Sequence, residues 1–498
     1  MRTTVIIEKK IYNHVMFTLS MPDIKAVFFV GIGTNDDIGY THHAYQLSKG
    51  NNIIANGGSQ LGFRLGMNAP LAVLFKCFGC NEISASIFPL FSSLITCAFI
   101  FLTAHILWGV RAAVFASLLW ISYPLQIVFD TQLSPSNQQA ACMITSIFLL
   151  FKAKQNEKRC EYNKFTPVLY VLSGAILCFG WLVNEVFVVI AVAAIPVLLV
   201  SKIPLKGIIL ALSGFVLIVF LELIIAYHFS GDLFARIHAI IQTENIIGSN
   251  KSLEYLPRVL FKIKEVNFSN EEGHFGILWY LFIVLTICMF FQKQWLICGF
   301  ACGVWLVVFY FQWGVMSLDG TPITKYIRYL SMIVPLQCLA IGGILTRWLQ
   351  QFQPQKKICI YMCFTLLCIH LYVCGALSVN AARIKTNDFH DISHYLISQK
   401  EDVIAFMDEM TAQYVEIISG NSFDIQWVDH YKNKPAPQKG YLVINGSRRV
   451  VEDHNYRKQL PGWFQNPPQR WEVVKEIKSK NKCEGFYRSF DPVIYKIQ

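Results

Sequence analysis

Apolar runs about as long as a bilayer is thick recur from the N-terminus to about residue 379, and they constrain the fold more than any other feature. About twenty consecutive apolar residues cross a bilayer as a helix. With 54% hydrophobic residues and a mean hydropathy of +0.42, the 498-residue chain is too apolar for a soluble protein. The pattern therefore predicts an α-helical integral membrane protein with about eleven transmembrane helices. These lie near residues 12–32, 84–107, 110–129, 137–152, 166–183, 186–200, 207–229, 276–291, 294–313, 327–346 and 358–378.

The end of the chain, residues 380–498, is polar and differs from the membrane body formed by residues 1–379. It contains an amphipathic stretch, residues 403–418, for which we predict a helix. Strand-like runs follow, the first of them at residues 440–445. A helix followed by strands indicates a small soluble α/β domain.

Lys and Arg residues mark one side of the predicted bundle. They gather at the N-terminus, after the fourth span and in later short connections, and about eleven spans place all of these in the cytoplasm. The same count places the C-terminal domain and two long loops, near 33–83 and 230–275, on the extracytoplasmic side. The formal net charge of +11 then reflects topology and lipid contact, and no basic stripe predicts nucleic-acid binding.

Two adjacent acids, Asp36 and Asp37, follow the first apolar run directly. A helix-like stretch comes next, with Tyr40 and Ala44 on one side. Carboxylates are costly inside a bilayer, so a pair at its edge usually faces water, a cation or a substrate. Adjacent acids also repel, which lets one of them hold a proton and act as a general base. The alternative is an ordinary solvated loop.

Other charged groups allow two interpretations each. Glu185 and Glu222 lie in apolar surroundings, where an acid is either functional or paired with a neighbouring helix. Lys325 and Arg328 either bind an anion or anchor the end of a span at the interface. His42 and His43 lie close to the acids and suggest a metal site. Consecutive residues of a helix point about a hundred degrees apart, however, which makes joint binding of one ion difficult. A divalent metal is therefore not favoured, and no cofactor is required.

Several segments, taken in order, resemble the multi-spanning glycosyltransferases of the GT-C type that use polyprenyl-phosphate sugars. This superfamily includes the protein O-mannosyltransferases and the lipid A aminoarabinose transferases. Its acidic pair in the first outer loop, followed by Tyr and an Ala-containing helix, is matched by Asp36, Asp37, Tyr40 and Ala44. FRLGMNAPLAVLFKCFG matches a later segment through Arg64 and Pro70, and KYIRYLSMIVPLQ matches the family's Arg-Tyr segment through Arg328, Tyr329 and Pro335.

The chain also departs from the family pattern at two positions. Where the family often has an Asp after the Pro of the loop behind the third span, this chain has Pro135, Ser136 and Asn137, with Asp130 as the nearest substitute. Where the family often has a Lys near the outer end of the fifth span, this chain has Asn184 and Glu185. Such positions contact phosphate or sugar in the family, so both departures bear on the identity of the donor.

The resemblance implies a glycosyltransferase that moves a sugar from a polyprenyl-phosphate donor to a lipid, glycan or protein acceptor. The acceptor hydroxyl must lose a proton as it attacks the anomeric carbon, which assigns the base to Asp36 or Asp37, with Asp36 favoured. The leaving phosphate needs cations nearby. Candidate phosphate-binding residues are Arg64, Lys325, Arg328 and Tyr329, and further candidates are Tyr40, His43, Asp130, Asn137 and Glu185. One direct displacement would invert the anomeric centre.

Two other classes of protein remain as alternatives. Many spans and a few intramembrane acids also suit a transporter or lipid flippase, but the two related halves typical of transporters are not visible here. A catalytically degenerate assembly subunit is the second alternative, because of Ser136 and Asn137. The long outer loops and the soluble outer domain favour an enzyme, and a bacterial inner membrane is the expected location.

Overall fold

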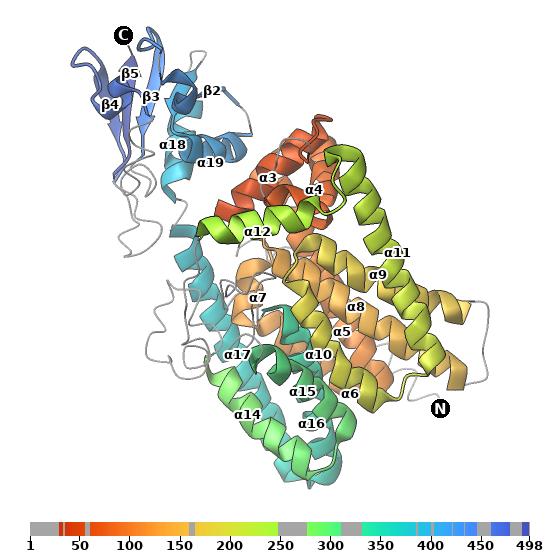
Figure 1. Ribbon diagram of the computed structural model, residues 1–498. Helices are drawn as coiled ribbons and strands as arrows, with labels where there is room; N and C mark the ends of the chain where they lie inside the picture. Colours follow the sequence, from red (N-terminus) through yellow and green to blue (C-terminus); the bar gives the residue numbers. More distant parts are fainter. Residues whose placement is uncertain are drawn as a thin grey trace. The chain divides into compact units, whose positions relative to one another are not determined.

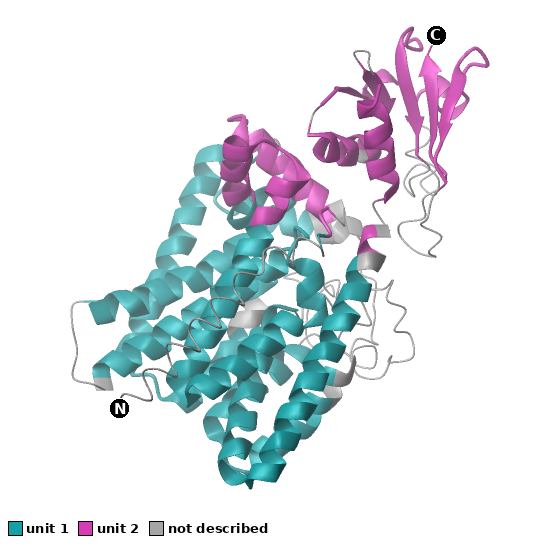
Figure 2. Ribbon diagram, turned by 180° about the vertical axis from the view of Figure 1, so that it is seen from behind, with its two compact units in different colours: residues 1–29, 52–67, 88–379 teal, residues 30–51, 68–87, 380–498 magenta. Residues whose placement is uncertain are grey.

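The computed structural model describes residues 29–32, 35–54, 60–158, 165–247, 276–309, 331–384, 387–399, 403–420, 422–432, 434–445, 460–478 and 491–497. The chain divides into two compact units, which are described separately (Figure 2). Unit 1 consists of residues 1–29, 52–67 and 88–379. Unit 2 consists of residues 30–51, 68–87 and 380–498.

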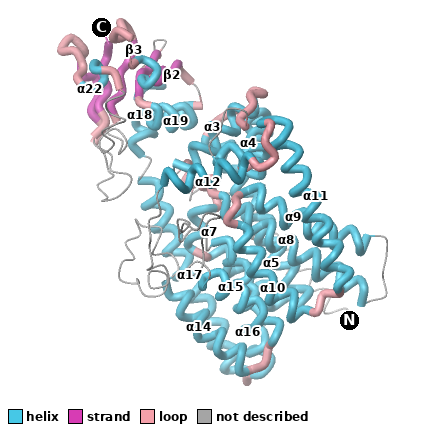
Figure 3. The backbone as a smooth tube through the Cα atoms, in the orientation of Figure 1, coloured by secondary structure: helices cyan, strands magenta, loops and turns pink. Residues whose placement is uncertain are grey.

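Unit 1 is a bundle of helices, and within its described residues it contains no strand (Figures 1 and 3). Its elements are η1 (Gln60–Phe63), α5 (Glu82–Trp108, whose first turns belong to unit 2), α6 (Val110–Ser122), α7 (Pro124–Phe129), α8 (Pro135–Lys158), α9 (Phe165–Val183), α10 (Phe187–Ser201), α11 (Leu205–Ser230), α12 (Ala235–Ile247), α14 (Gly276–Phe291), α15 (Trp295–Phe309), α16 (Val334–Gln351) and α17 (Pro354–Ile384).

The positions of these helices agree with the apolar runs of the sequence. Five helices in the described residues are long and apolar enough to cross a membrane: Glu82–Trp108, Phe165–Val183, Leu205–Ser230, Ser331–Gln351 and Pro354–Val379. Shorter apolar helices lie at the spans predicted near 110–129, 186–200, 276–291 and 294–313, for example Trp295–Phe309, whereas the span predicted at 137–152 falls in α8, which is not among the apolar helices. Most of the first predicted span, 12–32, lies outside the described residues, and the total number of crossings stays a prediction.

The span predicted at 110–129 is two helices instead of one. The chain breaks at Tyr123, whose φ of −68° and ψ of 122° are extended. Pro124 follows and begins α7, and the ring of a proline disfavours helical backbone at the residue before it. The break turns the chain into the loop that carries Asp130 and leads to α8.

Close backbone contact sets the position of α11 against α9. A Cβ atom added to Gly174 of α9 would lie 1.6 Å from the carbonyl oxygen of Ala211, and one added to Gly214 of α11 would lie 2.0 Å from that of Val171. Only glycine permits this approach, which is a common way for membrane helices to pack. The contact brings the end of α9 and the second half of α11 together at the charged site described below.

Unit 2 contains a five-stranded sheet in the order β2-β1-β3-β5-β4 (Figure 1). β1 pairs in parallel with β2 and β3, while β5 runs antiparallel to β3 and β4. The strands are β1 (Ile404–Met407), β2 (Asp424–Trp427), β3 (Gly440–Ile444), β4 (Glu472–Glu476) and β5 (Val493–Ile497). The helical elements are α3 (Asn35–Ser48), α4 (Leu65–Phe78, which begins in unit 1), α18 (Asn387–Ile397), α19 (Glu409–Ser419), η5 (Val428–Tyr431) and α22 (Gly462–Gln465).

The helix predicted at 403–418 is wrong for its first part, which forms strand β1. Asp408 separates the two elements: its carboxylate accepts a hydrogen bond from the backbone N–H of Thr411 at 3.2 Å and so caps α19. The preceding run, Ile404–Met407, is apolar on both faces because β1 is a central strand, and such a run does not alternate. The strand predicted at 440–445 is β3.

The acid-bearing helix α3 shares a core with the C-terminal part of the chain. Ile32 and Ile38 are buried in one cluster with Phe389 of α18 and Tyr414 of α19. The rings of Phe389 and Tyr414 are stacked, with centroids 4.1 Å apart. Burying one such aliphatic side chain stabilises a fold by about 2 kcal/mol. The C-terminal part of unit 2 therefore supports the helix that presents Asp36 and Asp37.

Candidate functional site

Asp36 and Asp37 both lie in the first turn of α3, where the positive end of the helix dipole stabilises negative charge. Asp36 is partly exposed, whereas Asp37 is 2% exposed. The hydroxyl of Thr41 donates a hydrogen bond to the backbone carbonyl of Asp37 at 2.7 Å and strengthens this turn. Of the two carboxylates, Asp36 is the one that a substrate from solution reaches more easily.

The entry of the chain into α3 is held by Glu82 at the start of α5. Its carboxylate accepts a hydrogen bond from the backbone N–H of Ile32 at 3.0 Å and lies 3.6 Å from Nε2 of His390 on α18. Gly31 precedes this contact with a φ of +73°, and a Cβ atom there would lie 1.8 Å from the Glu82 carboxylate. Glycine is therefore required at position 31, and the direction of α3 is set before its first turn.

Tyr40 and His43 lie on the same helix as the acids. Tyr40 is fully buried, and His43 is partly buried. Burial, and then the neighbouring His42, lowers the pKa of His43 to about 4, so this imidazole is neutral at physiological pH. The ring of His42 lies 6.0 Å from that of Trp427, at the end of β2. No three His, Cys, Asp or Glu side chains form a metal-sized group in the part of the chain that the structure describes.

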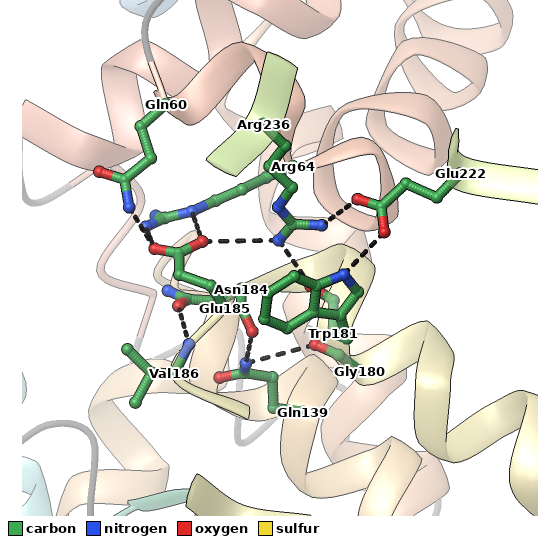
Figure 4. A network of polar contacts seen from close by, with 10 residues as sticks. All are labelled: Gln60, Arg64, Gln139, Gly180, Trp181, Asn184, Glu185, Val186, Glu222 and Arg236. Carbon is green, nitrogen blue, oxygen red and sulfur yellow. Dashed lines mark hydrogen bonds and ion pairs between the residues drawn. The ribbon is translucent and has the colours of Figure 1, made fainter. Parts of the chain in front are cut away.

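In unit 1, a buried network of charges surrounds the turn between α9 and α10 (Figure 4). Glu185 in this turn accepts hydrogen bonds from Gln60 and from Nη2 of Arg64, and its second oxygen accepts one from Nε of Arg64 at 3.2 Å. Two nitrogens of the Arg64 guanidinium, Nε and Nη2, thus bind the same carboxylate. The Arg64 side chain is 7% exposed and that of Glu185 14%.

A second guanidinium reaches the same carboxylate from α12. Nη2 of Arg236 lies 3.5 Å from the second oxygen of Glu185 and donates to the carbonyl of Trp181 at 2.6 Å. Nη1 donates to Glu222 of α11 at 2.5 Å, and Glu222 also accepts from Nε1 of Trp181 at 2.7 Å. The guanidinium lies over the Trp181 ring, 4.5 Å from its centroid, which adds a cation–π contact.

The network determines the protonation of Glu185, which lies in the turn outside both helices. Burial alone would raise its pKa, but Arg64 and Arg236 outweigh burial and lower the pKa to about 2. Glu185 is therefore ionised at any physiological pH and is a poor general base. The buried Nε of Arg236 has no hydrogen-bond partner among the described residues.

The loop behind α7 lies next to this turn. Asp130 is buried and accepts a hydrogen bond from Gln126 at 2.6 Å, while the Asn137 amide donates to the carbonyl of Phe129 at 2.7 Å. Gln139, in the first turns of α8, donates to the carbonyl of Asn184 at 2.8 Å and so ties α8 to the α9–α10 turn. Asp130 and Asn137 thus have local structural contacts near the network.

The structure joins some of the candidates from the sequence and separates others. Arg64 and Glu185, 121 residues apart in the chain, form an ion pair. Asp36, Asp37, Tyr40 and His43 belong to unit 2. The candidates Lys325, Arg328 and Tyr329 lie outside the described residues. Glu222 is paired, as one of its two interpretations predicted.

Three members of the network were not singled out from the sequence: Gln60, Trp181 and Arg236. The signal for Arg236 is its position in a long segment between two apolar runs, at the first turn of a short helix. That position alone does not identify a partner. Only the contacts of the folded chain bring Arg236 to Glu222 and Glu185.

Comparisons with known proteins agree on the fold. Residues 67–226 match the family model described as dolichyl-phosphate-mannose-protein mannosyltransferase. The crystal structure of ArnT from Cupriavidus metallidurans in the apo state is similar, with a TM-score of 0.56 and 12% identity, and the match covers 97% of this chain and 98% of that one. ArnT bound to undecaprenyl phosphate gives 0.54 and 14%, covering 95% and 96%.

A third solved structure, the Archaeoglobus fulgidus oligosaccharyltransferase in the apo form, has a TM-score of 0.52 and 11% identity. The match covers 87% of this chain and 68% of that one. A search of curated proteins finds no match. The chain therefore has a membrane glycosyltransferase fold of the GT-C type, and it is a multi-pass membrane protein.

Proposed function

We propose that the protein is a glycosyltransferase that moves a sugar from a polyprenyl-phosphate donor to an acceptor on the extracytoplasmic face. The observation that carries the proposal is the convergence of two buried guanidinium groups, Arg64 and Arg236, on one carboxylate. The fold supports it, since one similar ArnT structure holds undecaprenyl phosphate. The matched family model is named for a dolichyl-phosphate sugar.

The arginine pair suits the leaving group of this reaction. When the bond between the anomeric carbon and the phosphate oxygen breaks, negative charge grows on the phosphate. Guanidinium forks in a site of low dielectric stabilise that charge, because their geometry matches phosphate oxygens and little water competes. Glu185 keeps the two forks aligned, and the unused Nε of Arg236 is the donor that the phosphate would meet. Lys325, Arg328 and Tyr329 are proposed as further phosphate contacts.

We assign the acceptance of the hydroxyl proton to the acids of α3. The acceptor hydroxyl attacks the anomeric carbon, the carbon–phosphate oxygen bond breaks, and the hydroxyl proton passes to a carboxylate. We assign this role to Asp36, because it is more exposed than Asp37. Asp37 supports the turn from a buried position. A single displacement inverts the anomeric centre, and the reaction needs neither a cofactor nor a metal.

The remaining assignments concern location and supporting residues. The Lys and Arg residues of the short connections favour an orientation with the N-terminus in the cytoplasm and the C-terminal domain outside a bacterial inner membrane. Tyr40 and His43 support α3 from its buried side, while Asp130 and Asn137 shape the loop next to the network. The acceptor class, whether lipid, glycan or protein, is left to experiment.

The test measures transfer of sugar from radiolabelled polyprenyl-phosphate sugars in membranes of cells that produce the chain. Asp36→Asn should lower the rate by about 10²- to 10⁴-fold, the usual contribution of a general base. Asp391→Asn is the matched control, because Asp391 is an exposed acid on α18 of the same unit. Immunoblots of the membranes establish that the variants accumulate equally.

The outcomes separate the parts of the proposal. Loss of transfer in Asp36→Asn with normal transfer in Asp391→Asn supports both the activity and the base. Equal transfer in the wild type and in Asp36→Asn and Asp37→Asn would remove the acids of α3 from the mechanism. Absence of transfer with every polyprenyl-phosphate donor would refute the proposed activity.

A further inference from the structure

An apolar cavity of about 110 Å³ lies among α8, α9, α10 and α11 in unit 1. Its wall includes Leu150 of α8, Leu177 of α9, Val197 of α10 and Leu212 of α11. Leu212 is 57% exposed, so the cavity reaches the outer surface of the bundle. Cavities of this size lined by aliphatic and aromatic side chains bind small hydrocarbons. The space is sufficient for a short length of hydrocarbon chain.

The hydroxyl groups in the cavity wall form hydrogen bonds with other groups of the protein. The hydroxyls of Ser146 and Ser173 lie 2.9 Å apart and bond to one another, and that of Ser201 bonds to the carbonyl of Val197. A water molecule in a cavity needs two to four polar partners. Because these hydroxyls are already used, the cavity favours an apolar occupant.

Lysine residues gather where the cavity meets the end of α10. Lys202 is exposed and lies between two residues of the wall, Ser201 and Ile203. Lys206 is exposed in the first turn of α11, and Lys154 of α8 donates a hydrogen bond to the carbonyl of Ser201. Lys202 also has a φ of 50°, in the left-handed region that glycine usually occupies.

The cavity is separate from the arginine network. From Leu177 to Trp181 on α9 the rise is about 6 Å, and from Phe215 to Glu222 on α11 it is about 10 Å. The lysines lie beyond the far end of the cavity from the network, at the ends of α10 and α11 that the distribution of charge places in the cytoplasm. A ligand that uses both the cavity and Lys202 therefore has its polar group in the cytoplasmic leaflet.

We propose that this cavity holds part of one acyl chain of an anionic phospholipid, with the headgroup phosphate on Lys202 and Lys206. The apolar wall selects the chain, and the lysines select the negative headgroup. Lys154 donates a hydrogen bond to the carbonyl of Ser201 at the same end of the cavity as Lys202. This lipid is distinct from a sugar donor, whose phosphate would lie with Arg64 and Arg236. The proposal does not depend on the transfer reaction.

The test uses the full-length protein purified and delipidated in detergent, with lipid binding followed by native mass spectrometry. Dioleoyl phosphatidylglycerol and dioleoyl phosphatidylcholine share the same acyl chains and differ in headgroup charge. We expect one tightly bound phosphatidylglycerol, with an affinity about tenfold above that for phosphatidylcholine. Lys202→Glu should remove this preference, and Ala194→Phe, which fills the cavity, should remove the binding of both lipids.

Lys293→Glu is the matched control for Lys202→Glu. Lys293 is also exposed, lies in a turn between helices of unit 1 and has a φ of 51°, but its chain neighbours, unlike those of Lys202, do not line the cavity. Unchanged lipid preference in Lys293→Glu, with its loss in Lys202→Glu, supports the proposal. Equal affinity for both lipids, or equal effects of the two lysine variants, would overturn it. Displacement of phosphatidylglycerol by undecaprenyl phosphate, one molecule for one, would also overturn it by assigning the cavity to a donor tail.

Discussion

The protein has two acidic regions whose environments differ. Asp36 and Asp37 begin helix α3 in unit 2, where the helix dipole favours negative charge and Asp36 is partly exposed. Glu185 and Glu222 lie in unit 1, where guanidinium groups and the Trp181 indole hold them. Both regions place acids next to apolar surroundings, and in the second region the guanidinium groups of Arg64 and Arg236 neutralise them.

The difference separates two uses of a carboxylate. An acid held by two arginines has a depressed pKa and does not accept a proton from a hydroxyl, but it fixes the direction of both guanidinium forks. An exposed acid in the first turn of a helix is open to a substrate. The comparison supports the roles proposed above, organisation of the cations by Glu185 and proton transfer by Asp36.

After the loss expected for Asp36→Asn, the largest effect should come from removing a cation. Arg236→Ala should lower transfer by about 10²- to 10³-fold, the usual effect of removing one electrostatic donor, because the leaving phosphate loses a fork. Arg236→Lys keeps the charge but cannot reach Glu222, Glu185 and the Trp181 carbonyl together, so it should recover only part of the rate. The measurement is the steady-state transfer rate at saturating donor and acceptor.

Arg347→Ala provides the matched control, since Arg347 is an exposed arginine of α16 in the same unit. It should transfer at the rate of the wild type. Full activity in Arg236→Ala would break the comparison, because the network would then have only a structural role.

The parts of the fold that follow from local pattern were predictable. Helices α5, α9 and α11 agree with their apolar runs to within a few residues, because a bilayer-length apolar run leaves few other structures. The break at Tyr123 was not predicted, since it depends on the single proline that follows. Strand β1 was assigned to a helix, because its four apolar residues look alike in either structure until Asp408 ends the run.

The candidate site also has a part that was predictable from the sequence and a part that was not. Asp36 and Asp37 were identified from their neighbours in the sequence, Arg64 from the resemblance of its segment to the family, and Glu185 and Glu222 from their apolar surroundings. Pairing was not predictable, because Arg64 and Glu185 lie 121 residues apart and Arg236 reaches them from a different helix. Sequence pattern reports which side chain is unusual at its position. It does not report which other side chain neutralises it.

The next effect concerns stability and compares the two glutamates. Glu185→Gln should destabilise unit 1 by about 3 kcal/mol, because two buried guanidinium groups lose their shared countercharge. Glu222→Gln should cost less, about 1 kcal/mol, because its amide oxygen still accepts a bond from Arg236 and Glu185 still lies beside the same guanidinium. The measurement is thermal unfolding of the purified variants in one detergent. Equal losses of stability would show that the two carboxylates contribute equally to the network and that Glu185 is not its main countercharge.

Acid should weaken the two regions in different pH windows. The pKa of His43 falls from 6.5 to about 4 on folding, so the unfolded state binds the proton first and stability falls as pH drops from 6.5 to 4. The loss is at most about 3 kcal/mol. The pKa of Glu185 falls from 4.5 to about 2, so its contribution is lost only between pH 4.5 and 2.

Hydrogen exchange of peptides from α3 and from the α9–α10 turn measures the two windows separately. Asp408 acts in the opposite direction, because burial raises its pKa to about 6 and its effect favours the folded state at low pH. His43→Asn isolates the histidine: the difference in stability from the wild type should change between pH 6.5 and 4 and stay constant below pH 4. Loss of protection in both peptides at the same pH would contradict separate electrostatic control.

The smallest expected effect is that of a chelator, which should leave transfer unchanged. If the acids of α3 act directly on the acceptor proton, EDTA has no target in the mechanism. Asp36 and Asp37 are consecutive in a helix and point about a hundred degrees apart, so they do not chelate one ion together. The measurement is the transfer rate after EDTA treatment, and again after adding Mg²⁺ or Mn²⁺. A rate that falls with EDTA and returns with metal would make the acids ligands instead of a base, and Asp36 would then resemble Glu185 in organising a cation.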